Sequence, residues 1–349
     1  MPGMKRTGIA AATVLVCTMA IASPARADLP AADTEWTEQS PTSAWFQSSL
    51  FTAAEADDEL WVGGYQGQVE IFWPPATWST VLLRPPKPLL RRRSGGSWQE
   101  VDLPWMNYGL ISDMEAAGTR DLWVLGARFI WGQGNSYLAR WDGSAWTTVS
   151  APFPAYVSMD LAAASDAVFV ANVDRAWERR VHTYTGGQWT TGPESLAVSQ
   201  LASHPEGGAW LLGDDGGARV VARWDSDSWQ NIPLPEGSTV NRIYPLGQDH
   251  LLARVDGSHY QRWDGSAWTP AGPPTTFAAS DATLSPSGAL WLSGGSRVAN
   301  LVGSTWSIRS APLPDYGSGF SIRSITTAAD RLWITGGRSD RPVAAFTTP

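Results

Sequence analysis

The chain has very little of the chemistry that depends on sulfur or imidazole. Its 349 residues include one cysteine, Cys17, and four histidines, which show no metal-ligand spacing. No segment beyond the N-terminal region approaches the ~20 apolar residues that a transmembrane helix needs. These absences argue against a disulfide framework, a thiolate metal centre and a membrane-spanning segment.

The N-terminus has the three parts of a secretory signal peptide. The pair Lys5-Arg6 precedes the apolar run Gly8–Ala22. The small residues Ala25 and Ala27 stand at the two positions that signal peptidase recognises before its cleavage site. We therefore predict cleavage near Ala27, which divides the chain into a signal peptide (1–27) and a mature region (28–349). The protein is expected to be secreted or periplasmic.

Cleavage there would change both the charge and the thiol content. It removes Lys5, Arg6 and Arg26, so the net charge moves from −8 to about −11. It also removes Cys17; a lipid anchor on this cysteine is less favoured because Val16 is bulkier than the residue that usually precedes such a site. Because phosphate repels an acidic protein, nucleic acid is not expected as a partner.

Two short units recur along the chain. The first is an apolar run followed by a turn, and its central residue is Trp61, Trp123, Phe169, Trp210, Leu251, Trp291 or Trp333. After one longer interval these positions are spaced by 46, 41, 41, 40 and 42 residues. The second is a Gly-x-x-Trp unit, which occurs as RWDGSAWT at both Arg140–Thr147 and Arg262–Thr269.

A period near 40 residues, with short Trp- and Val-rich strands and Gly, Asp and Ser at turns, predicts a β-propeller. Each unit would supply four strands. In the third unit these are, from the centre outward, Val157–Ala163, Ala167–Asn172, Arg180–Tyr184 and Gln188–Thr191. We interpret the repeated turn and its Trp as blade-building parts rather than as a repeated binding site. Gly in the turn supplies positive φ, and the Trp fills the wedge between blades.

The two ends of the chain complement each other. The chain stops after a third strand near Val343–Phe346, and the segment around Trp36 resembles the missing outermost strand. Pairing these segments would close the ring and leave no open sheet edge. The sequence therefore predicts an all-β fold, a single seven-bladed β-propeller of four-stranded antiparallel blades over residues 28–349.

Parts of the repeat resemble known propeller families. Leu290–Gly295, followed by Trp306 and Pro312, is similar to a kelch repeat. The pairs Trp141-Asp142 and Trp263-Asp264 resemble the end of a WD repeat. The chain is thus similar to secreted bacterial kelch-like propellers. The resemblance implies a fold and not an activity.

One face of the predicted propeller carries loops of variable length, which is typical of a functional face. The loops that join second to third strands, and each blade to the next, vary widely, whereas the others are short. We call the face with the variable loops the variable-loop face. Aromatic residues outside the repeat gather in its loops: Trp73, Trp78, Trp105, Trp131, Trp177 and Tyr108. They are candidate anchors for a sugar, peptide or protein partner. Alternatively, the loops fold these rings onto the blades as satellite cores.

The innermost strands would line a central channel. Polar residues near their starts are Asp113, Asp160, Gln200, Asn241, Arg242, Asp281 and Arg323. Such a ring could orient a polar ligand, with Arg242 and Arg323 as candidate binding residues, or hold a cation through oxygen ligands. It could equally be a solvated ring of ion pairs and waters. No organic cofactor is expected.

A basic run, Arg84 to Arg93, stands out in this acidic chain. It is interpreted as an exposed strand face, with contact to an anionic glycan as the alternative.

Two functional hypotheses follow. The first is a monomeric, non-catalytic recognition propeller that binds a polysaccharide, peptide or envelope protein through the variable-loop face. The second is a glycoside-active hydrolase or lyase that uses Asp113, Asp160 and Asp281 at the channel mouth. The absence of a thiol from the predicted mature region argues against copper-radical chemistry, which needs a cysteine-linked tyrosine.

Overall fold

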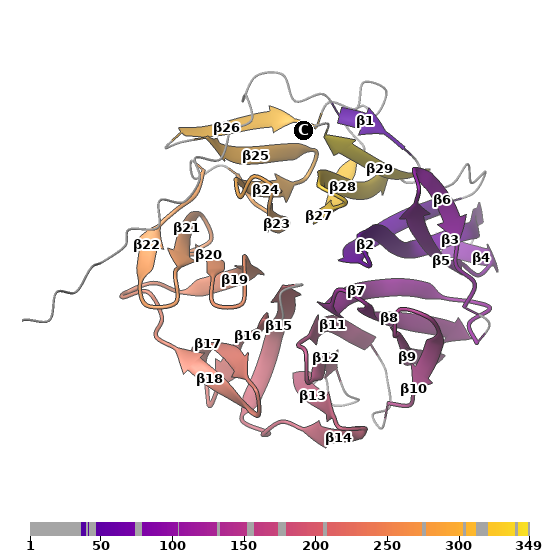
Figure 1. Cartoon of the computed structure of the whole chain (residues 1–349). Coiled ribbons are helices and arrows are strands. Elements are labelled where there is room, and N and C mark those ends of the chain that lie inside the picture. Colours follow the sequence, from indigo (N-terminus) through magenta and orange to yellow (C-terminus); the bar gives the residue numbers. More distant parts are fainter. Residues whose placement is uncertain are drawn as a thin grey trace, which may run out of the picture.

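The computed structural model describes residues 36–39, 41, 47–73, 79–103, 105–130, 133–151, 157–173, 179–204, 208–273, 277–302, 305–311, 320–338 and 341–347. These residues form seven antiparallel sheets arranged in a ring (Figure 1). The predicted all-β, seven-bladed propeller is confirmed. The predicted signal peptide, 1–27, lies outside the described residues.

The first three blades follow one another along the chain. Blade 1 contains β2 (Gln47–Ala56), β3 (Glu59–Trp73), β5 (Lys87–Ser94) and β6 (Ser97–Glu100), with β4 (Ser79–Arg84) paired to the end of β3. Blade 2 contains β7 (Leu110–Gly118), β8 (Asp121–Ile130), β9 (Gln133–Trp141) and β10 (Trp146–Val149). Blade 3 contains β11 (Val157–Ala163), β12 (Val168–Val173), β13 (Arg179–Thr185) and β14 (Gln188–Thr191).

The remaining blades repeat the same order. Blade 4 contains β15 (Leu196–His204), β16 (Gly208–Asp215), β17 (Ala218–Asp225) and β18 (Ser228–Ile232). Blade 5 contains β19 (Val240–Pro245), β20 (Leu251–Val255), β21 (His259–Trp263) and β22 (Trp268–Pro270). Blade 6 contains β23 (Asp281–Leu284), β24 (Leu290–Gly294), β25 (Arg297–Val302) and β26 (Thr305–Ser310). Blade 7 contains β27 (Ser321–Ala328), β28 (Arg331–Arg338), β29 (Arg341–Thr347) and β1 (Trp36–Glu38).

The ring closes as the chain ends predict. The N-terminal strand β1 pairs antiparallel with β29, with Trp36 opposite Thr347 and Glu38 opposite Ala345. It is the outermost strand of blade 7, next to the chain's C-terminal strand (Figure 1). The two ends of the described chain therefore share one sheet, which removes the open edge that a linear array of blades would leave.

In blade 1 the long segment Tyr65–Pro88, between the second and third strands of the repeat, extends the sheet. The sequence suggests a loop in this region, but β3 runs 15 residues to Trp73 and the chain returns as β4, which pairs only with β3. This hairpin makes blade 1 the one five-stranded sheet among the described residues.

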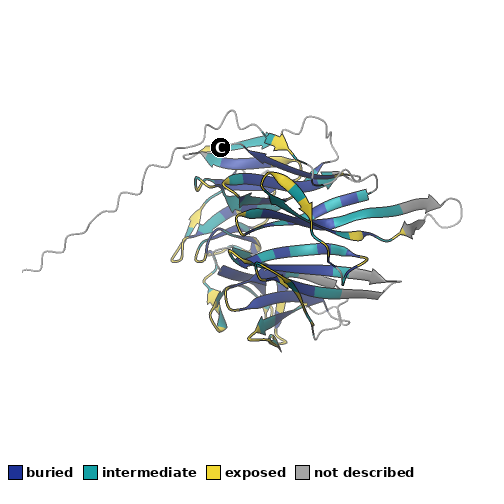
Figure 2. Cartoon of the chain, turned by 45° about the vertical axis from the view of Figure 1, so that its right-hand side comes forward, coloured by how far each residue is buried: buried dark blue, intermediate teal, exposed yellow. Residues whose placement is uncertain are grey.

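The hydrophobic core is divided among the junctions between blades. Buried residues form seven clusters within the described chain, and each contains residues from two neighbouring blades. The second strands β12 and β24 are buried along their whole length, because both of their faces pack on other blades. Figure 2 shows the buried residues inside the blades and the exposed ones at the turns. Stability thus depends on repeated interfaces between blades.

The repeated RWDGSAWT stretch forms the turn between the third and fourth strands. The Asp142 Oδ1 atom accepts hydrogen bonds from the backbone N–H of Ala145 at 2.8 Å and from the N–H and Oγ of Ser144. Gly143 has a φ of +91°. These hydrogen bonds lower the pKa of Asp142 to about 2. The second copy has the same arrangement at Asp264, so the repeated residues serve the turn.

Among the described residues, no helix has the length and apolar composition needed to cross a membrane.

Candidate functional site

The inner strands of the seven blades surround a central channel (Figure 1). The channel holds a cavity of about 700 Å³. Its wall includes most of the polar residues that the sequence places near the strand starts: Asp113, Asp160, Gln200, Arg242, Asp281 and Arg323. Asn241 is not in this wall, and its Oδ1 accepts the backbone N–H of Gly257 at 2.6 Å.

One polar side chain per blade holds a defined position in this wall. In six inner strands the pairing with the second strand shifts by one residue, which marks a β-bulge. Two of these strands have two shifts, and the relevant one is the second in β2 and the first in β7. The residues that directly follow these shifts are Thr52, Asp113, Asp160, Gln200, Arg242 and Ser324. In β23 the first paired residue, Asp281, makes the corresponding contact to the next blade. We call these seven the ring residues.

Five ring residues accept a hydrogen bond from the inner strand of the next blade. The backbone N–H groups of Met114, Leu161, Leu201, Ile243 and Ile325 donate to Thr52 (3.2 Å), Asp113 (2.9 Å), Asp160 (3.2 Å), Gln200 (3.0 Å) and Asp281 (2.9 Å) in turn. An inner strand is the edge of its sheet, so its outward N–H groups need partners from outside the blade. These side chains therefore join adjacent blades around the channel.

The channel carboxyl groups have raised pKa values. Burial, together with the charge of Asp160, raises the pKa of Asp113 to about 7. Burial and the neighbouring Asp113 raise the pKa of Glu115 well above its usual value. Burial also raises the pKa values of Asp160 and Asp281. Near neutral pH, part of this cluster is protonated.

A second connection crosses three blades. The Ser203 hydroxyl on β15 donates to Glu115 Oε2 on β7 at 2.7 Å, and its oxygen accepts the backbone N–H of Ala163 on β11 at 3.1 Å. Sequence reasoning misses Ser203. Nothing in its local sequence distinguishes that serine from other strand serines.

Two channel arginines have no partner of this kind. Arg242 and Arg323 are exposed side chains in the channel wall. Within the described part of the chain, neither forms a hydrogen bond or an ion pair. The Arg242 guanidinium lies 5.8 Å from the Tyr244 ring centroid, and its charge lowers the pKa values of Asp160 and Asp281 against the effect of burial.

A channel-bound cation, one of the alternatives that the sequence leaves open, has no recognisable ligand set among the described residues. No group of three or more His, Cys, Asp or Glu side chains among the described residues could hold a metal ion. The carboxylate oxygens of Asp113, Asp160 and Asp281 already accept backbone hydrogen bonds.

Of the aromatic residues that the sequence suggests as anchors for a partner, the structure describes the side chains of two, Trp105 and Tyr108. Trp105 is half-buried and packs on the core between blades 1 and 2, with its ring centroid 6.4 Å from that of Trp146. Tyr108 is 43% exposed and is accessible to a partner. Trp78, Trp131 and Trp177 lie outside the described residues, as does the side chain of Trp73.

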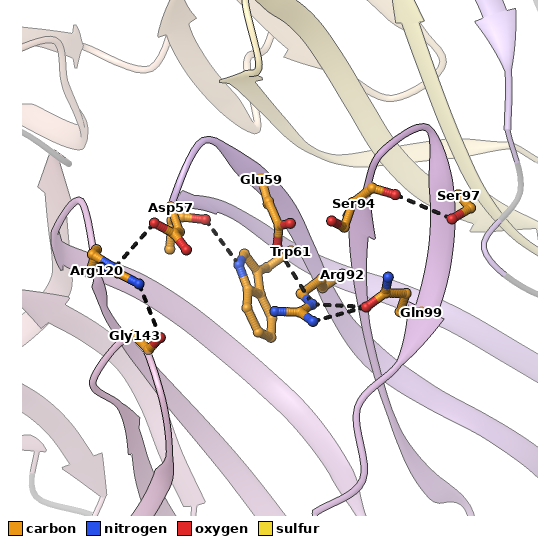
Figure 3. A network of polar contacts seen from close by, with 10 residues as sticks. Asp57, Glu59, Trp61, Arg92, Ser94, Ser97, Gln99, Arg120 and Gly143 are labelled. Atoms are coloured by element: carbon orange, nitrogen blue, oxygen red, sulfur yellow. Dashed lines mark hydrogen bonds and ion pairs between the residues drawn. The ribbon is translucent and has the colours of Figure 1, made fainter.

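The basic run is used mainly within the blades. Figure 3 shows the Arg92 guanidinium between Glu59, at 3.5 Å, and the side chain of Gln99, at 2.9 Å. Arg93 donates to Gln39 Oε1 at 2.8 Å and lies 5.0 Å from the Trp333 ring centroid, which ties blade 1 to blade 7. These contacts favour the structural interpretation of the run over a glycan-binding one.

Comparisons with known proteins extend the fold assignment. No family model and no curated protein sequence matches the chain. The structure is similar to that of virginiamycin B lyase from Staphylococcus aureus, with 12% identity, a TM-score of 0.61, and coverage of 91% of this chain and 100% of that one.

It is also similar to YCF48 bound to D1 peptide, with 14% identity, a TM-score of 0.58, and coverage of 91% and 98%. A third similar structure, YCF48 from Cyanidioschyzon merolae, has 13% identity, a TM-score of 0.57, and coverage of 90% and 98%. At these identities the likeness establishes the propeller fold, which hosts different functions in different proteins.

Proposed function

We propose that the protein is a monomeric, non-catalytic recognition propeller that binds a segment of a protein partner at the channel mouth and the variable-loop face. One observation carries this proposal. The channel carboxylates are engaged with backbone N–H groups, whereas Arg242 and Arg323 form no hydrogen bond or ion pair among the described residues. A wall with that arrangement is suited to receiving a polar ligand.

Two further points support an interaction role. A similar propeller, YCF48, binds a peptide. The predicted signal peptide would bring this chain to a secreted or periplasmic location, where its partner would be a protein of the envelope or the surroundings. Tyr108 and the loop residues Trp73, Trp78, Trp105, Trp131 and Trp177 are the proposed aromatic anchors.

The test is a titration of the purified protein with a pooled peptide library and, separately, with soluble polysaccharides. Intrinsic tryptophan fluorescence is recorded, and new reducing ends are assayed in the same samples. We expect saturable binding of peptides and no new reducing ends. Trp131→Ala and Trp177→Ala should weaken binding, whereas the control Trp189→Phe, at a blade position, should not. Saturable binding of polysaccharide alone would overturn the protein-segment proposal.

The alternative is a hydrolase or lyase that acts on glycosides through Asp113, Asp160 and Asp281. The observation in its favour is the pKa of Asp113, raised to about 7, which suits general acid–base chemistry. Against it, the oxygens that a catalytic carboxyl would use accept backbone hydrogen bonds. New reducing ends that disappear in Asp113→Asn, with polysaccharide binding retained, would establish this alternative.

A further inference from the structure

The ring position of blade 5 departs from the pattern of the other blades. Six blades place a side chain there that can accept a hydrogen bond, but Arg242 can only donate. The N–H that an acceptor at this position would serve is that of Ala282 in blade 6. That N–H donates instead to its own neighbour, Asp281 Oδ1, at 2.8 Å. The junction between blades 5 and 6 therefore does not need Arg242 for its backbone hydrogen bonds.

Arg323 provides a second guanidinium on the other side of blade 6. It is the residue inserted at the bulge of β27, between Ile322 and Ser324. It is exposed and lines the same cavity of about 700 Å³ as Arg242. Two cations with no ion pair among the described residues thus flank one blade in a confined space.

We propose that Arg242 and Arg323 form a binding site for a carboxylate group of the partner segment, either its C-terminal carboxylate or an Asp or Glu side chain. This inference rests on the proposed function and specifies its ligand. A guanidinium presents paired N–H donors that match the two oxygens of a carboxylate. The nearby Asp160 and Asp281 do not take this role, because neither lies within 4 Å of Arg242 as an ion pair and both accept backbone N–H groups.

The test uses one peptide pool in four forms: a free or an amidated C-terminus, each with either Glu or Gln at the internal acidic positions. Binding to the full chain is measured by fluorescence anisotropy for the wild type, Arg242→Gln, Arg323→Gln and the double variant. Arg341 is an exposed arginine on β29, and Arg341→Gln is therefore the matched control for the loss of one positive charge.

We expect binding to need at least one carboxylate form of the pool, and to fall about tenfold or more with each channel substitution while Arg341→Gln stays near wild type. Loss on amidation would identify the C-terminus as the source, and loss on Glu-to-Gln exchange would identify the side chain. Equal binding of all four forms, unaffected by the two channel substitutions, would overturn this inference and leave the proposed function standing. Absence of binding by every form would overturn the proposed function itself.

Discussion

Gln200 and Arg242 occupy the same ring position in neighbouring blades, yet they make different contacts. The Gln200 amide accepts the N–H of Ile243 at 3.0 Å and donates to its carbonyl oxygen at 2.8 Å, so it extends the backbone pairing from blade 4 to blade 5. Arg242 makes no such contact with blade 6 and remains exposed in the channel. The comparison teaches that one position in a repeated fold can join neighbouring blades in most repeats and be free of that structural role in another.

Among single substitutions at one pH, removal of the Gln200 side chain should produce the largest loss of stability. Gln200→Ala leaves a backbone N–H and a carbonyl of Ile243 without their partner, and we expect a loss of about 2 kcal/mol in the free energy of unfolding. Arg242→Ala should change it by less than about 0.5 kcal/mol. Urea unfolding of both variants measures the difference. Equal losses would mean that Arg242 also holds its junction together.

The pH dependence of stability should differ between the buried carboxyl group of Asp113 and the exposed one of Asp142, because their pKa values are shifted in opposite directions. The folded-state pKa of Asp113 is about 7 against an ordinary 3.8, so between these values the folded chain binds more protons than the unfolded chain. Stability should therefore fall as pH rises through this window, by at most about 1.4 kcal/mol per pH unit from this group. The raised pKa values of Glu115, Asp160 and Asp281 act in the same direction.

Asp113→Asn tests the assignment of that slope. The variant cannot titrate at this position, so its stability should vary less between pH 4 and pH 7 than that of the wild type. The control is Asp142→Asn, because Asp142 is exposed and its pKa is shifted the other way. Thermal unfolding at several pH values gives the slopes. An unchanged slope in Asp113→Asn would assign the dependence to other groups.

Arg242→Gln tests the comparison from the other side, at a junction that has no ring-residue hydrogen bond among the described residues and is joined instead by the Tyr244 and Tyr260 hydroxyls. Arg242→Gln places the blade 4 side chain in blade 5 and offers an acceptor toward blade 6. We expect a gain of about 0.5–1 kcal/mol in the free energy of unfolding, alongside the loss of carboxylate binding. Urea unfolding and the peptide assay are made on the same preparation. A variant that is less stable than the wild type would contradict this account of the junction.

The smallest effect is expected at the repeated turn. Asp142→Ala removes the acceptor for the N–H groups of Ser144 and Ala145, which are exposed to water and can bond to it instead. The midpoint of thermal unfolding should fall slightly, and less than in Gln200→Ala. Since the pKa of Asp142 is lowered to about 2, this contribution should be present above its ordinary value of 3.8 and lost as pH falls through about 2.

The blade architecture could be predicted from the sequence because its signals are local. The second-strand tryptophans recur about every 40 residues, and the Asp142-Gly143 turn contains its own hydrogen-bond acceptor and its positive-φ residue. The closing strand at Trp36 is also recognisable, since it repeats a unit that the last blade lacks. The sequence does not predict the hairpin of β3 and β4, because this segment has no counterpart in the other units.

The sequence by itself determined that seven similar units build one closed ring, and that polar residues stand at the starts of the inner strands. Only the tertiary structure decided which of these residues hold the ring together. The reason is that the partner of Asp113 is the N–H of Leu161, 48 residues away on another blade, and no local pattern encodes that contact. The same geometry leaves Arg242 and Arg323 exposed in the channel. The Ala282 N–H, which an acceptor at position 242 would serve, is satisfied by Asp281 within blade 6.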